Sequence, residues 1–275
     1  MKELITRSLA GLAYLAFMVG CLLFCKYSFL ILMLLVVTMM VIEFNRMNMG
    51  NLFPAAKVLS ILAAVTVFTL VFCHLAFGMS GRFILLSIVP VIGISVSLLF
   101  EKDRSHLPDA LSALASFAYL AVPMALFNFL VFKDGEYDGI LLLCLFILVW
   151  MSDVGAYCFG CALGQKYGPR LCPSISPKKS WIGAIGGAAV AIGTGALMGW
   201  LGWLPFGIWH CMGLALVIDV TGIFGDMIES IWKRHAGIKD SGKIIPGHGG
   251  MLDRFDSAVA AIPAALCYLV IFGLL

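Results

Sequence analysis

Residues Ser230–Asp256 read SIWKRHAGIKDSGKIIPGHGGMLDRFD, and the sequence on both sides of this stretch is almost wholly apolar. Within it, basic and acidic side chains alternate with five glycines. The basic residues are Lys233, Arg234, His235, Lys239, Lys243, His248 and Arg254, and the acids are Asp240, Asp253 and Asp256. Cations beside carboxylates, with glycines that let backbone N–H groups approach an anion, are typical of a site that handles phosphate and a metal ion. The apolar flanks predict that this site is held at a membrane surface.

The composition supports a membrane protein. Of 275 residues, 62% are hydrophobic and 12% are charged, and the mean hydropathy is +1.04. A soluble domain carries about twice that share of charged residues. Because every backbone polar group inside a bilayer needs an internal partner, runs of this kind predict an all-α, polytopic integral membrane protein. The net charge of +3 is small, and we expect no nucleic-acid partner.

Nine apolar segments approach the roughly 20 residues that a transmembrane helix needs. They lie at about 7–24, 27–43, 55–77, 82–100, 108–131, 139–160, 181–203, 206–229 and 257–274. We therefore predict one polytopic domain over residues 1–275 with about nine transmembrane helices. The first five (about 7–131) are expected to form a scaffold. The last four, with loops 161–180 and 230–256, are expected to carry the chemistry. The N-terminal segment resembles a signal peptide, but a second span follows it at once, so we expect it to be retained.

The basic residues predict the orientation. With the N-terminus in the cytoplasm, 15 of the 18 Lys and Arg residues fall on the cytoplasmic side. The far side then holds Lys26, Arg82 and Lys133. An excess of this kind marks the cytoplasmic side of bacterial and other cell membranes. We expect a protein of the cell (inner) membrane whose N-terminus and two long polar loops face the cytoplasm, where nucleotides are.

The eighth apolar segment contains Asp219, Asp226 and Glu229. Spacings of seven and three place these acids on one helical face, and Ser230 and Lys233 continue that face. Acids in a membrane helix are costly unless they meet water, a metal ion or a basic partner. Further on, Asp253 and Asp256 are also three residues apart. Together with Asp226 they would form an oxygen-ligand site suited to magnesium.

Other polar residues leave two interpretations open. Asp153, in the sixth segment, either pairs with a loop lysine or belongs to the site. Ser176-Pro177 predicts a turn and a helix start, and Lys178-Lys179 next to it either anchors the chain at the surface or binds phosphate at a helix N-terminus. Glu43, at the end of the second segment, is expected to be an interfacial charge that reaches water.

Together these residues resemble the phosphatidate cytidylyltransferase family, also called CDP-diglyceride synthetases. The resemblance rests on Ser230, Lys233-Arg234, Lys239-Asp240, His248-Gly249-Gly250 and Asp253-Arg254-Phe255-Asp256, with Ser152–Tyr157 and Ser176–Lys179 upstream. It covers the second half of the chain closely and the first half only as a hydrophobic pattern. One departure is Ile182, which stands where the family often has Glu and so removes a carboxylate near that loop.

The resemblance implies the reaction of CTP with phosphatidate to give CDP-diacylglycerol and pyrophosphate. It implies magnesium, with room for a second cation, on Asp226, Asp253 and Asp256. The implied catalytic residues are Lys233, Arg234, Lys239, His248 and Arg254. The implied substrate-binding residues are Ser176, Lys178, Lys179, Ser230, Lys243, Gly249 and Gly250, and the supporting acids are Asp153, Asp219, Glu229 and Asp240. His248 is alternatively a structural histidine in a glycine-rich turn. The expected partners are CTP, phosphatidate and the lipid bilayer, and a homodimer is left open.

Two other classes of protein compete with this interpretation. Another membrane phosphotransferase would need different motifs or substrates: a CDP-alcohol phosphotransferase carries Asp-Gly-x-x-Ala-Arg, which this chain lacks, and a polyprenyl-phosphate sugar-phosphate transferase would depend on a sugar nucleotide. A transporter would place its charged site near the bilayer midplane between repeats. Most charge here lies in one cytoplasmic loop, which disfavours a transporter.

Overall fold

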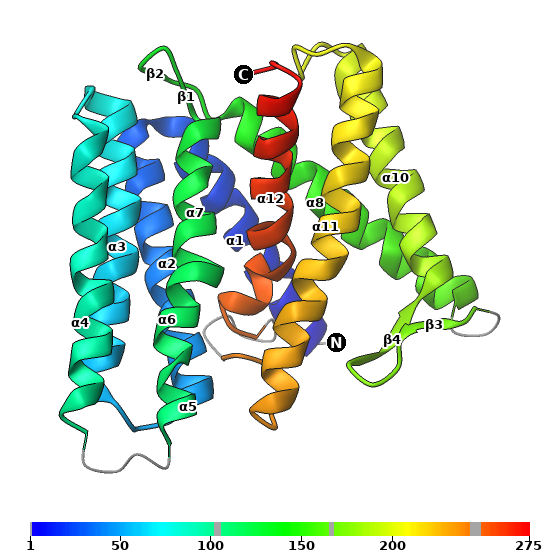
Figure 1. Cartoon of the computed structure of the whole chain (residues 1–275). Coiled ribbons are helices and arrows are strands. Elements are labelled where there is room, and N and C mark those ends of the chain that lie inside the picture. The colour runs from blue at the N-terminus through cyan, green and yellow to red at the C-terminus, as the bar shows by residue number, and fades with distance from the viewer. Residues whose placement is uncertain (1, 102–105, 165–167, 243–248) are drawn as a thin grey trace. The chain divides into compact units, whose positions relative to one another are not determined.

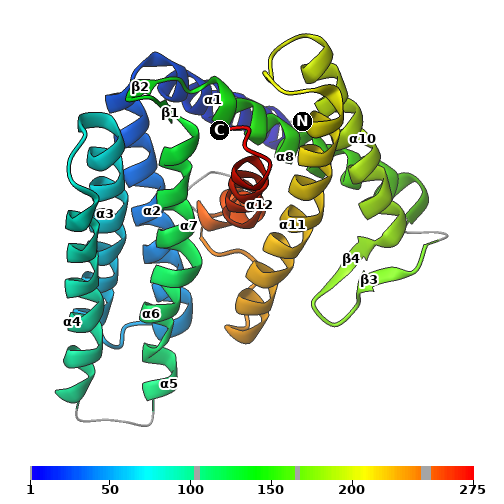
Figure 2. The ribbon, with the colours of Figure 1, turned by 45° about the horizontal axis from the view of Figure 1, so that its top comes forward.

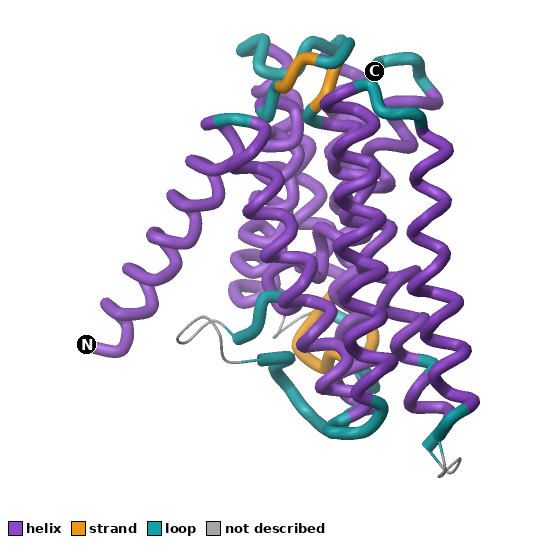
Figure 3. The backbone as a smooth tube through the Cα atoms, turned by 90° about the vertical axis from the view of Figure 1, so that its left-hand side faces the viewer, coloured by secondary structure: helices purple, strands orange, loops and turns teal. Residues whose placement is uncertain are grey.

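The computed structural model describes residues 2–101, 106–164, 168–242 and 249–275, with side chains from residue 11 onward. Nearly all of this is helix, and the few strands are short (Figure 3). Eight helical segments are long and apolar enough to cross a membrane. They are Lys26–Met49, Pro54–Phe77, Gly81–Leu99, Leu107–Leu130, Ile140–Gly164, Trp181–Trp200, Ile208–His235 and Leu252–Ile271. This confirms the prediction of an all-α polytopic membrane protein.

The first predicted segment corresponds to helix α1 (Lys2–Phe24). Its described apolar part, Gly11–Phe24, is shorter than a full membrane span. The count of nine transmembrane helices therefore stays a prediction.

The chain divides into two compact units. The first contains residues 1–139 together with 235–255, and the second contains 140–234 together with 256–275. The polar segment 235–255 thus groups with the N-terminal half of the chain. The prediction of a single domain with an N-terminal scaffold and a C-terminal catalytic part stays a prediction.

In the first unit, α3 (Pro54–Phe77) packs against both α2 (Lys26–Met49) and α4 (Ile88–Leu99) (Figure 1). Pro54 starts α3, where the missing N–H of proline is harmless. Gly78 ends α3, and its N–H donates a hydrogen bond to the carbonyl of Cys73. Its φ is +66°, a backbone conformation that residues other than glycine rarely adopt. The 3₁₀ helix η1 (Gly81–Ser87) then leads into α4.

The predicted span 108–131 is broken into short helices. They are α5 (Leu107–Ala110), α6 (Ser112–Ser116), the π-helical turn η2 (Phe117–Ala121), α7 (Val122–Leu126) and the 3₁₀ helix η3 (Phe127–Leu130). Pro123 explains the π turn before it, because proline has no N–H to bond back along an α-helix. The hairpin β1 (Phe132–Lys133) and β2 (Glu136–Tyr137) follows. Its turn residues Asp134 and Gly135 both have positive φ, as two-residue hairpin turns require.

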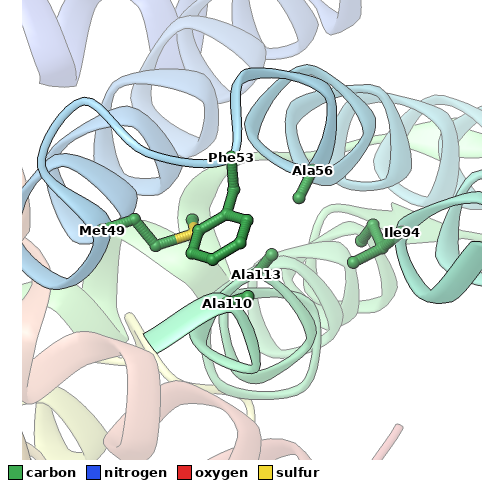
Figure 4. Packing of buried hydrophobic residues seen from close by; sticks show 6 residues of the cluster. All are labelled: Met49, Phe53, Ala56, Ile94, Ala110 and Ala113. Atoms are coloured by element: carbon green, nitrogen blue, oxygen red, sulfur yellow. The ribbon is translucent and has the colours of Figure 1, made fainter. Parts of the chain in front are cut away.

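A small apolar core lies where these helices of the first unit meet (Figure 4). The labelled residues are Met49, Phe53, Ala56, Ile94, Ala110 and Ala113. Phe53 is 4% exposed, and its ring lies beside Met49 and Ala113 (Figure 4). The alanines allow the helices to approach closely, which is how helices pack where hydrophobic driving force is weak.

In the second unit, α10 (Trp181–Trp200) packs along α8 (Ile140–Phe159) (Figure 2). Glycines make this possible: a Cβ at Gly186 would lie 2.4 Å from the Phe159 side chain, and one at Gly155 would lie 2.8 Å from Val190. Between the two helices come the π turn η4 (Gly160–Gly164) and the hairpin of β3 (Arg170–Cys172) and β4 (Ser176–Ser180). The close packing of α8 and α10 therefore depends on these glycines.

The structure corrects three predicted boundaries. Ser176-Pro177 lies in strand β4 rather than at a helix start, and α10 begins after Ser180, whose hydroxyl accepts a hydrogen bond from the Gly183 N–H at 3.1 Å. Helix α11 (Ile208–His235) continues past the predicted end at 229. Helix α12 (Leu252–Ile271) begins before the predicted start at 257. The motif residues at both ends of the segment 230–256 are therefore helical.

Candidate active site

A glycine, Gly225, lets α11 approach α12 closely in the second unit. A Cβ at Gly225 would lie 2.5 Å from the carbonyl oxygen of Asp256 and 3.0 Å from the side chain of Ala260, so no larger residue fits there. At Gly222 a Cβ would make ordinary contact with Ser257. This close approach places the residue after Gly225, which is Asp226, beside the first turns of α12.

Three acids meet at that point. Asp226 and Glu229 of α11 and Asp256 of α12 each offer a carboxylate oxygen, and these oxygens lie within 4.8 Å of one another. Glu229 is fully buried, whereas the two aspartates are partly exposed. We call Asp226, Glu229 and Asp256 the carboxylate cluster. Its oxygen donors fit a hard divalent cation, which prefers carboxylates and keeps several waters.

Two lysines neutralise part of this charge. The Lys179 ammonium, on β4, lies 2.6 Å from Oδ2 of Asp226. The Lys233 ammonium pairs with the Glu229 carboxylate one turn back along α11. Lys233 is 8% exposed, so this ion pair is buried. Ser230 donates a hydrogen bond to Oδ1 of Asp226 at 3.3 Å.

The sequence placed Glu229 among the supporting acids. Its i, i+3 spacing from Asp226 was the signal that it could join the cluster as a third oxygen donor.

Asp253, the third predicted metal ligand, is held by a different set of contacts in the first unit. Its Oδ2 accepts hydrogen bonds from the Ser241 N–H at 2.9 Å, the Ser241 hydroxyl at 2.9 Å and the Gly250 N–H at 2.8 Å. Gly249 has φ +82°, and a Cβ there would lie 2.6 Å from the same oxygen. The Asp253 carboxylate thus binds the backbone of the glycine-rich segment before α12. Its role as a metal ligand stays a prediction.

Glu43 of α2 was expected to reach water, and this expectation is wrong. The residue is 5% exposed. Its carboxylate accepts hydrogen bonds from the Met251 N–H at 2.9 Å, the Leu252 N–H at 2.8 Å and the Ser241 hydroxyl at 3.0 Å. We call Glu43 and Asp253 the carboxylate pair. Sequence reasoning missed Glu43, because its partners lie about 200 residues further along the chain.

The described hydrogen bond of Asp219 is made with a serine of α8, and not with Lys179 or Lys233. Asp219 is 2% exposed, and its Oδ1 accepts a hydrogen bond from the Ser152 hydroxyl of α8 at 2.6 Å. A Cβ at Gly187 of α10 would lie 2.9 Å from the same oxygen. Asp219 therefore joins α11 to α8 and α10, and its predicted role of orienting lysines stays untested.

Most of the remaining predicted residues lie at the surface of the unit that contains them. The exposed ones are Asp153, Lys178, Arg234, Lys239, Asp240 and Arg254, and Ser176 is partly exposed. Exposure suits groups that would meet a soluble nucleotide or a lipid head group. Lys243 and His248 lie outside the described residues, so the structure says nothing of their predicted roles.

Comparison with known protein families matches residues 5–272 to a family described as the cytidylyltransferase family. Proteins named phosphatidate cytidylyltransferase are among the similar curated sequences. Those of Staphylococcus aureus (strain COL) and Staphylococcus epidermidis (strain ATCC 12228) are each 38% identical over 164 residues, which is 59% of this chain and 60% of the relative. The protein of Brucella suis biovar 1 (strain 1330) is 51% identical over 125 residues, which is 46% of this chain and 44% of the relative. The chain thus aligns with less than two thirds of each relative.

Proposed function

We propose, from the premise that this chain belongs to the cytidylyltransferase family, that it transfers a cytidylyl group from CTP to phosphatidate. A phosphate oxygen of phosphatidate attacks the α-phosphorus of CTP, the bond between the α-phosphorus and the bridging oxygen breaks, and pyrophosphate leaves. The product is CDP-diacylglycerol. The observation that carries the proposal is the carboxylate cluster with its two lysines, of which Asp256 and Lys233 belong to the motif Ser230–Asp256.

Asp226, Glu229 and Asp256 would hold a magnesium ion in this proposal. When bound, the ion would neutralise charge that develops on the phosphates during transfer. Three carboxylate oxygens within 4.8 Å of one another support a cation at this point, since the two lysines neutralise only part of the charge of the three acids. Asp253 is kept as a further candidate ligand by the sequence resemblance.

The lysines would bind phosphate oxygens. Lys179 and Lys233 each pair with an acid of the cluster, so their ammonium groups lie beside the proposed metal. The exposed Arg234, Lys239 and Arg254 are proposed to bind the triphosphate and the lipid phosphate. Such transfer is catalysed chiefly by positioning and by charge stabilisation. The phosphate nucleophile is already ionised at neutral pH, so the proposal assigns no general base.

The proposed site lies on the cytoplasmic side of the inner membrane. The excess of basic residues in the polar loops of the second half supports this orientation. Phosphatidate would approach within the bilayer, with its phosphate at the interface, and CTP would approach from water.

The test uses the purified full chain in detergent, with phosphatidate, magnesium and CTP carrying labelled cytidine. We expect label to enter the organic-soluble lipid fraction only when phosphatidate and magnesium are both present. Asp226→Asn should abolish this incorporation, because it removes a charge from the carboxylate cluster. Asp134→Asn is the matched control: Asp134 lies on the exposed β1–β2 turn, and asparagine tolerates its positive φ.

A folded protein that incorporates no label under these conditions would overturn the proposal. Equal incorporation of label into lipid when a labelled sugar nucleotide replaces CTP would instead favour the sugar-phosphate transferase.

A further inference from the structure

We propose that Glu43, on a helix of the N-terminal half, is a positioning residue for the glycine-rich segment 249–252 of the motif. The inference rests on the proposed function, since it takes this segment to be part of the active site. It gives α2 a specific task in the reaction, where the sequence indicated only a scaffold.

The hydrogen bonds of the Glu43 carboxylate carry the inference. Oε1 accepts the N–H of Met251, and Oε2 accepts the N–H of Leu252. Leu252 begins α12, so these N–H groups stand at the start of the helix, where they have no partner within it. A carboxylate at a helix N-terminus is favoured both by these donors and by the helix dipole. Glu43 therefore fixes where α12 begins.

The same carboxylate is joined to Asp253 through one hydroxyl. Ser241 Oγ lies 3.0 Å from Glu43 Oε2 and 2.9 Å from Asp253 Oδ2. The Gly250 N–H donates to Asp253, and the next two N–H groups along the chain donate to Glu43. The carboxylate pair therefore accepts hydrogen bonds from three successive backbone N–H groups, which leaves this part of the segment little freedom to move.

The glycines around Glu43 indicate that this contact determines the local sequence. A Cβ at Gly242 would lie 2.6 Å from Oε1 of Glu43, and a Cβ at Gly250 would lie 2.4 Å from Oε2. Real Cβ atoms do not approach oxygen that closely, so any side chain at either position would displace the carboxylate. Gly250 is therefore needed to admit Glu43, in addition to any contact its backbone makes with phosphate.

The surrounding donors explain why a carboxylate is required at this buried position. Glu43 is 5% exposed, and an ionised carboxylate at that depth is stable only when donors surround it. Glutamine would keep the size but would turn an N–H₂ group toward one of the donors. Glu43→Gln should therefore release the segment while leaving most of the packing of α2 intact.

The experiment measures amide hydrogen exchange of the peptide that covers 249–254, together with steady-state kinetics. For Glu43→Gln we expect exchange in this peptide to become at least about tenfold faster, with other peptides unchanged. We expect kcat to fall about tenfold or more, because small misplacements of reacting groups reduce rates strongly. The KM for phosphatidate should change less than about threefold, because the segment is misplaced rather than removed.

Asn45→Ala is the matched control. Asn45 lies on α2, is 1% exposed, and donates to Ser60 Oγ at 2.6 Å, so its loss weakens the contact between α2 and α3 without touching the segment. We expect a lower unfolding temperature with normal exchange in 249–254 and a normal kcat.

The inference is overturned if Glu43→Gln leaves both exchange and kcat unchanged, or if exchange rises equally throughout the first unit. A parent protein that transfers no cytidylyl group would defeat the proposed function instead, and the exchange measurement would still decide whether Glu43 holds the segment.

Discussion

The carboxylate cluster and the carboxylate pair use the same chemical group in opposite ways. In the cluster, Asp226, Glu229 and Asp256 face one another and two lysine ammonium groups. In the pair, Glu43 and Asp253 face backbone N–H groups and a serine hydroxyl. Acids that face each other are stabilised by added cations, whereas acids that face N–H donors are already satisfied by the chain. The first arrangement suits the binding of a cation, and the second suits holding a segment of the chain in place.

The difference also predicts that variants of the two groups of acids affect different properties of the protein. Variants of the cluster should change the requirement for magnesium, because they remove oxygen ligands or their counter-charges. Variants of Glu43, or of the Ser241 hydroxyl beside it, should change the protection of the glycine-rich segment and leave that requirement unchanged.

The largest effect is expected for Asp256→Asn. Loss of one charged oxygen from the cluster should reduce kcat by about 10³-fold and raise the magnesium concentration needed for half-maximal activity. Initial rates over a magnesium titration measure both quantities, and chelation should abolish the activity of the parent. Normal magnesium dependence in this variant would remove Asp256 from the cation site. Asp134→Asn, in the same titration, should behave as the parent.

Next is Glu229→Gln, which removes the charge opposite the buried Lys233 ammonium. Breaking one partner of a buried ion pair destabilises proteins by about 3 kcal/mol or more. Thermal unfolding in detergent should show this loss. The double variant Glu229→Gln with Lys233→Met should recover part of it, because no buried charge is left uncompensated. A single variant as stable as the parent would show that Glu229 contributes as a ligand rather than as an ion-pair partner.

A smaller effect distinguishes two adjacent lysines. Lys179 pairs with Asp226, whereas Lys178 is exposed. Lys179→Met should lower kcat/KM by about tenfold to a hundredfold, in the range of one lost charge-assisted contact. Lys178→Met should cost less, and initial rates with CTP provide the comparison. Equal losses would mean that the contact with Asp226 does not matter for the reaction.

The smallest effect is expected for Ser241→Ala on the side of the pair. The variant loses the hydroxyl beside Glu43 and Asp253, but the Ser241 N–H still donates to Asp253. We expect exchange in the 249–254 peptide to rise only about threefold and kcat to stay within about twofold, because the backbone N–H donors to both carboxylates remain. Ser97→Ala is the control, because the Ser97 hydroxyl donates to the carbonyl of Ile94 in the same helix, α4. A loss as large as that in Glu43→Gln would show that the hydroxyl, rather than the Glu43 carboxylate, holds the segment.

Sequence reasoning predicted what depends on local pattern. Helical periodicity placed Asp226 and Glu229 on one face of a helix, and both lie in the cluster. It did not predict that helices α11 and α12 extend into the polar segment, because hydropathy marks where the bilayer ends and not where the helix ends. It also took Ser176-Pro177 as a helix start, although the hydroxyl that caps α10 belongs to Ser180.

By itself, the sequence determined the helical membrane class, the candidate site residues and the family, because these depend on composition and on spacing within short segments. Only the tertiary structure decided which acids face each other and which face the backbone. Asp226 meets Asp256 because Gly225 lets α11 and α12 approach. Glu43 meets Met251 and Leu252 across about 200 residues of chain. No local pattern encodes such contacts, because they form only when the helices pack.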